Sequence, residues 1–167
     1  MKLIIIDGQS GAGKTTYANS ISDNVIHMDD FFLPIELRTE ERLSEAGGNI
    51  HYERFKEEVV DKLRAGEAIT YRVFNCKEMA YTGETDIDVS RTVVIEGAYS
   101  MHPYFRWDEL DIPKETVFMS LDPDEQASRI EKRNGKVVAE IFKEKWIPME
   151  NRYFEEFKIK EKCDKII

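Results

Sequence analysis

An α/β sandwich, with a mainly parallel five-stranded sheet flanked by helices, is the fold that this sequence predicts. Three observations lead to it. The chain opens on an unbroken apolar run, Leu3-Ile4-Ile5-Ile6, which is typical of a strand buried on both faces of a parallel sheet. Further short apolar strands alternate with segments of helical periodicity. A glycine-rich turn separates the first strand from the first helix.

The first part of the chain is expected to contain two strands and two helices. The turn at 8–13 leads into a helix at 14–22, and a second strand follows at 25–28. Residues 31–49 are expected to be irregular, because proline and paired glycines interrupt them. Apolar residues at helical spacing predict an amphipathic helix over 52–65, and the glycine that follows it is a natural stop.

The second part is expected to add three strands and a helix. Strands are predicted at 69–74, 93–95 and 116–121, with a loop or a small hairpin after the first of them. An Asp-Pro pair starts a helix over 124–133. The remaining elements are expected to be helices over 137–146 and 149–160 and a short last strand at 163–167.

Length and composition indicate one soluble, globular domain over 1–167. Apolar residues make up 41% and charged residues 34% of the chain, which is the balance of a folded soluble protein. The longest apolar run is too short for a membrane span, and Met1-Lys2 leaves no room for a signal peptide. We therefore expect a cytoplasmic protein. Its two cysteines, Cys76 and Cys163, are expected to be incidental thiols.

The charge balance bears on the kind of partner. The net charge is −9, and no cluster of Lys and Arg provides a basic face. A nucleic-acid partner is therefore disfavoured, because such partners require many cations against their phosphates. We expect a small-molecule acceptor, and neither nucleic acid nor membrane. The oligomeric state stays open, a homodimer included.

The glycine-rich turn matches the pattern G-x-x-x-x-G-K-[ST] through Gly8, Gly13, Lys14 and Thr15. Glycines let backbone N–H groups turn inward around an anion, and the helix start adds its positive end. Lys14 is predicted to reach the β- and γ-phosphates of ATP, and the Thr15 hydroxyl to bind Mg²⁺. The predicted ATP-binding residues are Gly8, Ser10, Gly11, Ala12, Gly13, Lys14, Thr15 and Thr16.

Acidic residues follow two other predicted strands. Glu96 ends the strand "TVVIE" and is placed to hold Mg²⁺ beside the turn, although a surface carboxylate at a strand end is the alternative. Asp29 and Asp30 follow the strand "VIHM". Either could orient a substrate hydroxyl and accept its proton, and a solvated turn explains the pair equally well.

Several segments together resemble a known family. In chain order, "GQSGAGKTT", "HMDDFF", "VVIEG", "SLDPDEQASRIEKRNG" and "NRYFEEFKIKEKCDKII" are similar to the uridine kinase branch of P-loop kinases. That branch includes nicotinamide riboside kinases and is related to bacterial pantothenate kinase. The resemblance implies a P-loop NTPase fold with a short helical lid over about 124–147. It also implies phosphate transfer from ATP, with Mg²⁺, to a primary hydroxyl.

The resemblance implies roles for single residues. Asp29 matches the aspartate that acts as base and magnesium ligand, Asp30 takes the variable position after it, and Glu96 matches the family glutamate. Arg129 and Arg133 match the lid arginines that stabilise the transferring phosphoryl group. Their i, i+4 spacing puts both on one helical face, where pairing with nearby glutamates is the alternative.

The acceptor side is less completely matched. Tyr52 and Glu53 resemble the family's ribose-binding pair, although a glutamate in a first helical turn is also favoured by the helix dipole. Asp30 and Phe74 are the other predicted acceptor contacts. Pyrimidine-specific members carry a tyrosine where Phe74 stands and a histidine in the following loop, which here reads "NCKEMAY". A phenyl ring cannot hydrogen-bond, so this departure disfavours a pyrimidine nucleoside.

The leading hypothesis is thus an ATP-dependent kinase acting on a nucleoside or another ribosyl compound. A kinase of the same fold with a non-nucleoside acceptor, such as pantothenate or a sugar alcohol, is the first alternative. A nucleotide-operated switch is the second, although the sequence has no N-K-x-D motif of a GTPase. ATP and GTP are not distinguished as phosphate donors.

Overall fold

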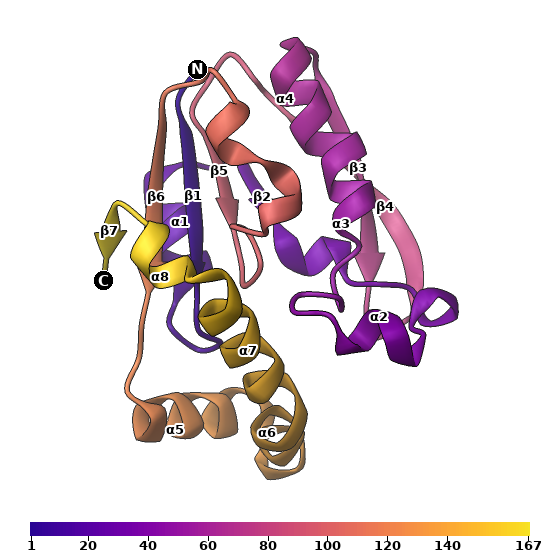
Figure 1. Cartoon of the computed structure of the whole chain (residues 1–167), viewed down its shortest axis with the longest axis vertical. Coiled ribbons are helices and arrows are strands. Elements are labelled where there is room, and N and C mark those ends of the chain that lie inside the picture. The colour runs from indigo at the N-terminus through magenta and orange to yellow at the C-terminus, as the bar shows by residue number, and fades with distance from the viewer.

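A five-stranded parallel sheet forms the centre of the computed structural model, which describes all 167 residues (Figure 1). Its strand order is β2-β5-β1-β6-β7, and every neighbouring pair is parallel. The strands are β1 (Leu3–Gly8), β2 (Val25–His27), β5 (Val93–Glu96), β6 (Lys114–Met119) and β7 (Lys165–Ile166). The predicted fold class is confirmed.

Strand β1 lies in the middle of the sheet, and both of its faces are covered. Leu3 and Ile5 belong to the larger of two apolar clusters, whereas Ile4 and Ile6 belong to the smaller one. The smaller cluster packs under helix α1 (Lys14–Ile21), and the larger one under α7 (Ile147–Phe157) and α8 (Ile159–Lys162). Figure 1 shows α1 behind the sheet and α7 and α8 in front of it. Burial on both faces explains why the strand is apolar throughout.

The helix predicted over 52–65 forms as one continuous helical segment. It consists of α3 (Tyr52–Phe55), a π-helical turn (Lys56–Val60) and α4 (Asp61–Ala65). Gly66 ends it with a φ of 67°. The preceding 31–49 segment is not wholly irregular, because α2 (Glu40–Ser44) and a 3-10 turn (Ile35–Leu37) interrupt it.

The second half supplies the helices of the region predicted to be a lid. They are α5 (Pro123–Asn134), α6 (Lys136–Ile141) and a π-helical turn (Phe142–Trp146) that leads into α7. The predicted helices over 137–146 and 149–160 therefore join into one run, which ends at Lys158 with a φ of 52°. Figure 1 shows α5 and α6 beyond the carboxyl end of the sheet. None of the helices has the length and apolar character needed to cross a membrane.

The predicted strand at 69–74 forms, but it does not join the main sheet. It is β3 (Ile69–Asn75), which pairs only with the antiparallel strand β4 (Ala80–Ile87). The small hairpin left open by the sequence is therefore present. Ile69 and Tyr71 are buried, whereas Thr70 and Arg72 are exposed. This alternation is typical of a half-buried antiparallel strand, whereas the central strands are buried on both faces.

A fully buried carboxylate at Asp7 joins three parts of the fold. Its Oδ1 accepts from the backbone N–H groups of Gly8 at 2.7 Å and Tyr99 at 3.1 Å. Its Oδ2 accepts from the N–H of Met101 at 2.9 Å and from the Tyr153 hydroxyl at 2.7 Å. Asp7 thus ties the end of β1 to the segment after β5 and to α7.

Burial raises the pKa of the Asp7 carboxyl group from 3.8 to about 6, against the effect of its hydrogen bonds. The folded chain therefore holds a proton that the unfolded chain has already released between these two values. The stabilisation is complete below the unfolded pKa and is lost as the pH rises through the folded one.

We predict that this group lowers the free energy of unfolding by roughly 2 kcal/mol between pH 4 and pH 7. Urea unfolding of the wild-type chain and of the Asp7→Asn variant, which cannot titrate here, should show the wild type losing that much relative to the variant. A wild type that gains stability over Asp7→Asn across this interval would show that the hydrogen bonds outweigh burial.

Candidate active site

The glycine-rich turn connects β1 to α1 at the carboxyl end of the sheet. Gly8 has a φ of 138°, and a Cβ placed on it would lie 2.2 Å from the carbonyl oxygen of Met119, so only glycine fits. Gly13, with a φ of 88°, precedes the first residue of α1. The turn is held from the β6 side, because the N–H of Gln9 donates to Met119 O at 3.1 Å.

Lys14 folds back onto this turn. Its Nζ donates to the carbonyl oxygens of Gly8 at 2.9 Å and Gln9 at 2.8 Å. The side chain is therefore restrained at the mouth of the turn by neutral acceptors only. Phosphate oxygens, being charged, are stronger acceptors for an ammonium group than carbonyl oxygens are.

Glu150 of α7 supports the turn from the other side. Its carboxylate accepts from the backbone N–H of Ser10 at 3.1 Å and from the Ser10 hydroxyl. On the lid side, the Gln126 side chain donates to Ser10 O at 3.0 Å. Burial raises the pKa of Glu150, although the hydrogen bonds from Ser10 favour its ionised form. Helices α5 and α7 are thus both attached to one residue of the turn.

Thr15 and Glu96 come together although 81 residues separate them. The Thr15 hydroxyl donates to Glu96 Oε1 at 3.0 Å. Glu96 ends β5 and is nearly buried, while Thr15 lies in the first turn of α1. His27, at the end of the neighbouring β2, places its Nδ1 2.6 Å from the same oxygen. That hydrogen bond raises the pKa of His27. A hydroxyl and a carboxylate are hard oxygen donors of the kind Mg²⁺ prefers, so this pair fits the predicted ion.

Asp29 and Asp30 lie in the 3-10 turn (Met28–Phe31) that follows β2, and they face different surroundings. The Asp29 residue is exposed and makes no side-chain hydrogen bond. Partial desolvation by the surrounding protein, together with the nearby negative charge of Glu96, raises its pKa, and Lys14 acts in the opposite direction. The Asp30 carboxylate instead accepts from the Tyr71 hydroxyl at 3.0 Å. Of the two, Asp29 is the one left free.

A buried arginine holds this turn in place. Arg54 of α3 is 3% exposed and donates to the backbone oxygens of Asp30 and Arg72 and to the Glu58 carboxylate. Its guanidinium also stacks on Phe31, 4.1 Å from the ring centroid. The position of Asp29 and Asp30 therefore depends on α3 and β3 as well as on β2.

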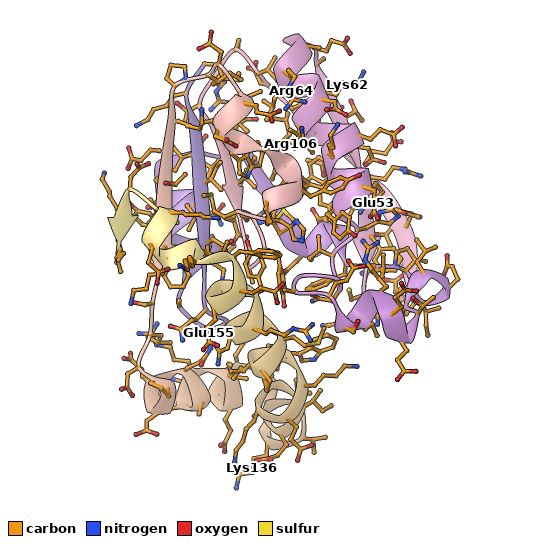
Figure 2. The ribbon with its side chains drawn as sticks, in the orientation of Figure 1. Glu53, Lys62, Arg64, Arg106, Lys136 and Glu155 are labelled. Carbon is orange, nitrogen blue, oxygen red and sulfur yellow. The ribbon has the colours of Figure 1, made fainter.

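The two predicted lid arginines differ in position. Arg129 donates from Nη1 to the carbonyl oxygen of Gly11 at 3.2 Å and also pairs with Glu125. Arg133, one turn later on α5, hydrogen-bonds to Asn134 and lies away from the turn. Lys136, at the start of α6, points away from the sheet (Figure 2). Of the two arginines, Arg129 is thus the one that contacts the glycine-rich turn.

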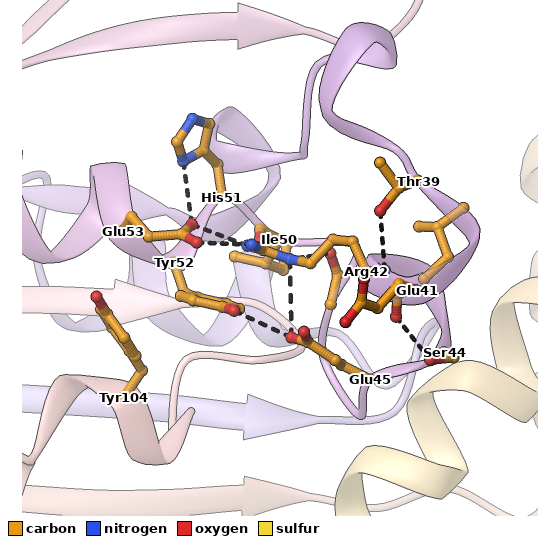
Figure 3. A network of polar contacts seen from close by, with 12 residues as sticks. Thr39, Glu41, Arg42, Ser44, Glu45, Ile50, His51, Tyr52, Glu53 and Tyr104 are labelled. Atoms are coloured by element: carbon orange, nitrogen blue, oxygen red, sulfur yellow. Dashed lines mark hydrogen bonds and ion pairs between the residues drawn. The ribbon is translucent and has the colours of Figure 1, made fainter.

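Glu53 is tied into a polar network on the other side of the acidic turn (Figure 3). Both of its oxygens accept from Arg42, at 2.6 and 2.8 Å. Burial opposes ionisation of Glu53, but these bonds prevail and lower its pKa. The Tyr52 hydroxyl donates to Glu45 at 3.0 Å, and its ring stacks on His102. A pocket of about 350 Å³ opens here, lined by Leu33, Leu37, Thr39, Glu41, Arg42, Glu45, His51 and Glu53.

Phe74 is separated from these groups. It is 3% exposed and packs edge-on against Tyr81 of β4, with ring centroids 5.4 Å apart. The structure therefore brings Lys14, Thr15, Glu96 and Asp29 to one edge of the sheet. Tyr52 and Glu53 lie beside a separate pocket, and Phe74 lies inside the hairpin.

Sequence reasoning missed three residues of this site: His27, Arg54 and Glu150. His27 carried a weak signal, because it is a polar residue at a strand end one place before the acidic turn. Arg54 stands in a first helical turn, and Glu150 in an acidic helix, where charged residues are usually solvated. Only the packing of distant elements distinguishes them from surface charges.

No family model matches this chain, and no curated protein matches it either. Solved structures do. One is described as a possible uridine kinase from Bacillus stearothermophilus, with a TM-score of 0.69, 19% identity, and coverage of 99% of this chain and 87% of that one. Another, a proposed fructose transport system kinase from Silicibacter sp. TM1040, has a TM-score of 0.75, 18% identity, and coverage of 99% and 89%. This chain therefore has the fold of the P-loop kinases, as its sequence resemblance implied.

Proposed function

We propose that this protein is an ATP-dependent small-molecule kinase that transfers the γ-phosphate to a primary hydroxyl, the 5′-hydroxyl of a nucleoside or another ribosyl compound. The observation that carries the proposal is the grouping of Lys14, Thr15, Glu96 and Asp29 at the carboxyl ends of β1, β2 and β5. Parallel α/β sheets bind ligands at this edge. The grouping supplies a phosphate cradle, two metal-binding oxygens and one free carboxylate.

In this proposal the donor side consists of the turn and the metal-binding pair. Backbone N–H groups of the turn and Lys14 bind the triphosphate. Thr15 and Glu96, with Asp29 nearby, would hold Mg²⁺, which neutralises charge on the phosphates when bound. Arg129 reaches the transferring group from above the turn, and Arg133 joins it only if the lid closes further.

On the acceptor side, Asp29 orients the hydroxyl and accepts its proton. Its raised pKa brings it closer to the range in which a carboxylate is an effective base. Asp30, Tyr52 and Glu53 remain proposed acceptor contacts, and so does Phe74, although it is buried against Tyr81 and the hairpin would have to open for it to touch an acceptor. Asp30 and Glu53 already have partners within the chain, so each would have to exchange a hydrogen bond to touch an acceptor. An acceptor in solution also fits the acidic chain better than a nucleic acid, and we place the reaction in the cytoplasm.

Acceptor-dependent ADP release tests the proposal. Nucleosides, nicotinamide riboside, pantothenate and simple polyols are supplied in turn with ATP and Mg²⁺. A kinase hydrolyses ATP slowly alone and releases ADP rapidly with its acceptor. A release rate that no acceptor changes would instead favour a nucleotide-operated switch.

With the active acceptor, Asp29→Asn should lower kcat by about 100- to 10,000-fold, because the amide cannot take the proton. ATP binding should be unchanged, as measured by equilibrium titration. Asp23→Asn, at an exposed acid remote from the turn, is the matched control and should retain wild-type activity. If Asp30→Asn loses more activity than Asp29→Asn, the base is Asp30.

Replacing Arg129 by alanine should lower kcat by on the order of 1,000-fold, because the transferring phosphoryl group loses a charged partner. Lys132→Ala removes an exposed cation from the same helix and should have little effect. Equal, small losses in both variants would mean that Arg129 serves only its pairing with Glu125.

A further inference from the structure

A second cleft lies between the segment after the acidic turn and the start of α7. Phe32, Arg38, Leu43 and Asn49 line it on one side, and Lys145, Trp146 and Met149 on the other. Phe32 directly follows the 3-10 turn that carries Asp29. The N–H of Leu33 donates to Asn49 O at 2.9 Å, which fixes the two ends of the first wall against each other.

Two cations face this cleft without acidic partners. Arg38 is half-buried, and its only well-formed hydrogen bond runs from Nε to the carbonyl oxygen of Leu33 at 2.7 Å. Lys145 lies 4.7 Å from the centroid of the Trp146 ring, and neither cation forms an ion pair. The chain has 33 acidic and 24 basic residues. In such an acidic chain, a half-buried arginine without a carboxylate partner indicates a place for an external anion.

A buried amide at the same cleft also lacks a partner. Asn49 is 4% exposed, and neither its Nδ2 nor its Oδ1 makes a hydrogen bond of normal geometry, although the Tyr99 hydroxyl is nearby. A buried amide without partners is costly, unless a ligand completes its hydrogen bonds. The Nδ2 group can donate to a carboxylate oxygen.

The cleft is close to the proposed base. Arg38 lines the cleft together with Phe32, and Phe32 directly follows the 3-10 turn (Met28–Phe31) that carries Asp29. A ligand held by Arg38 can therefore extend toward Asp29. The free space is narrow, about 20 Å³, which is room for one small polar group and not for a ring.

The other pocket has the opposite character. Glu41, Glu45 and Glu53 line it, and its one arginine, Arg42, is already bound to Glu53 at both oxygens. An anion would meet three carboxylates there and no free cation. The two pockets therefore differ in charge: carboxylates line the first, and two cations without acidic partners line the second.

We propose that the phosphate acceptor carries a carboxylate, which binds in the cleft between Arg38 and Lys145 with Asn49 as a further donor. This inference rests on the proposed kinase function, and it specifies the acceptor as an anionic alcohol. Arg38 is the principal contact, since it is half-buried and its guanidinium matches a carboxylate. Phe32 and Trp146 form the apolar walls beside it.

The test uses alcohols that differ only in the charge of one group. The pairs are pantothenate with panthenol, glycerate with glycerol, and nicotinic acid riboside with nicotinamide riboside. Binding without ATP is followed by Trp146 fluorescence, because the other tryptophan, Trp107, is 6% exposed and lies in the core. At least one carboxylate member should bind about 10-fold or more tightly than its neutral partner, and Arg38→Ala should weaken it by about 10- to 100-fold.

Matched variants distinguish loss of the contact between Arg38 and the carboxylate from a general loss of positive charge or of folding. Lys143→Ala, at an exposed cation two residues before Lys145, should bind like the wild type, and Arg38→Lys should recover part of the affinity. Thermal unfolding of each variant checks that it folds. The inference is overturned if neutral members bind as tightly, if the preference survives in Arg38→Ala, or if no carboxylate member saturates below about 10 mM.

The same pairs distinguish this inference from the kinase proposal. If neutral alcohols accelerate ADP release and carboxylates do not, the result supports the kinase function and contradicts the proposal that the acceptor is anionic. Carboxylates that bind through Arg38, while no alcohol of either kind accelerates ADP release, would support the binding site and contradict the kinase function.

Discussion

The buried carboxylate of Asp7 is the interaction on which the site most depends. It accepts hydrogen bonds from the first residue of the glycine-rich turn, from the segment that follows β5, and from Tyr153 on α7. Lys14 follows this turn, Glu96 ends β5, and α7 carries Glu150. A single side chain at the end of the central strand therefore sets the relative position of the elements that carry the candidate site. Four donors on one buried carboxylate leave little freedom for any of them.

The site combines a few cations with many acids. Asp29, Glu96 and Glu150 lie around a turn whose nearest cations are Lys14 and Arg129. A nucleotide alone would add further negative charge, so the arrangement suits a nucleotide that arrives with a divalent cation. The two pockets differ in how their arginines are paired, because Arg42 is neutralised by Glu53 whereas Arg38 has no acidic partner. Local pairing, more than net charge, distinguishes the two pockets.

Much of the fold followed from local patterns. The central strand was predictable because burial on both faces demands an unbroken apolar run, and the glycine-rich turn because its glycines stand directly between that strand and the first helix. The hairpin was harder to place. The sequence predicted a strand at 69–74 and left a loop or a small hairpin open after it, but only the structure shows that this strand pairs outside the main sheet. His27, Arg54 and Glu150 could not be recognised, since each acquires its partner only through elements that are distant in sequence.

By itself, the sequence determined the parallel sheet, the glycine-rich turn and the candidate acids at the strand ends, because these depend on residue type and near-neighbour spacing. The tertiary structure decided which of those groups are free to act. In the folded chain the Asp29 side chain has no hydrogen-bond partner, whereas Asp30 accepts from Tyr71 and Glu53 accepts from Arg42. Phe74 is buried against Tyr81. The tertiary structure also brought Arg38, Asn49 and Lys145 to one cleft. The physical reason is that a side chain's availability depends on the partners that packing supplies, and packing joins residues far apart in the chain.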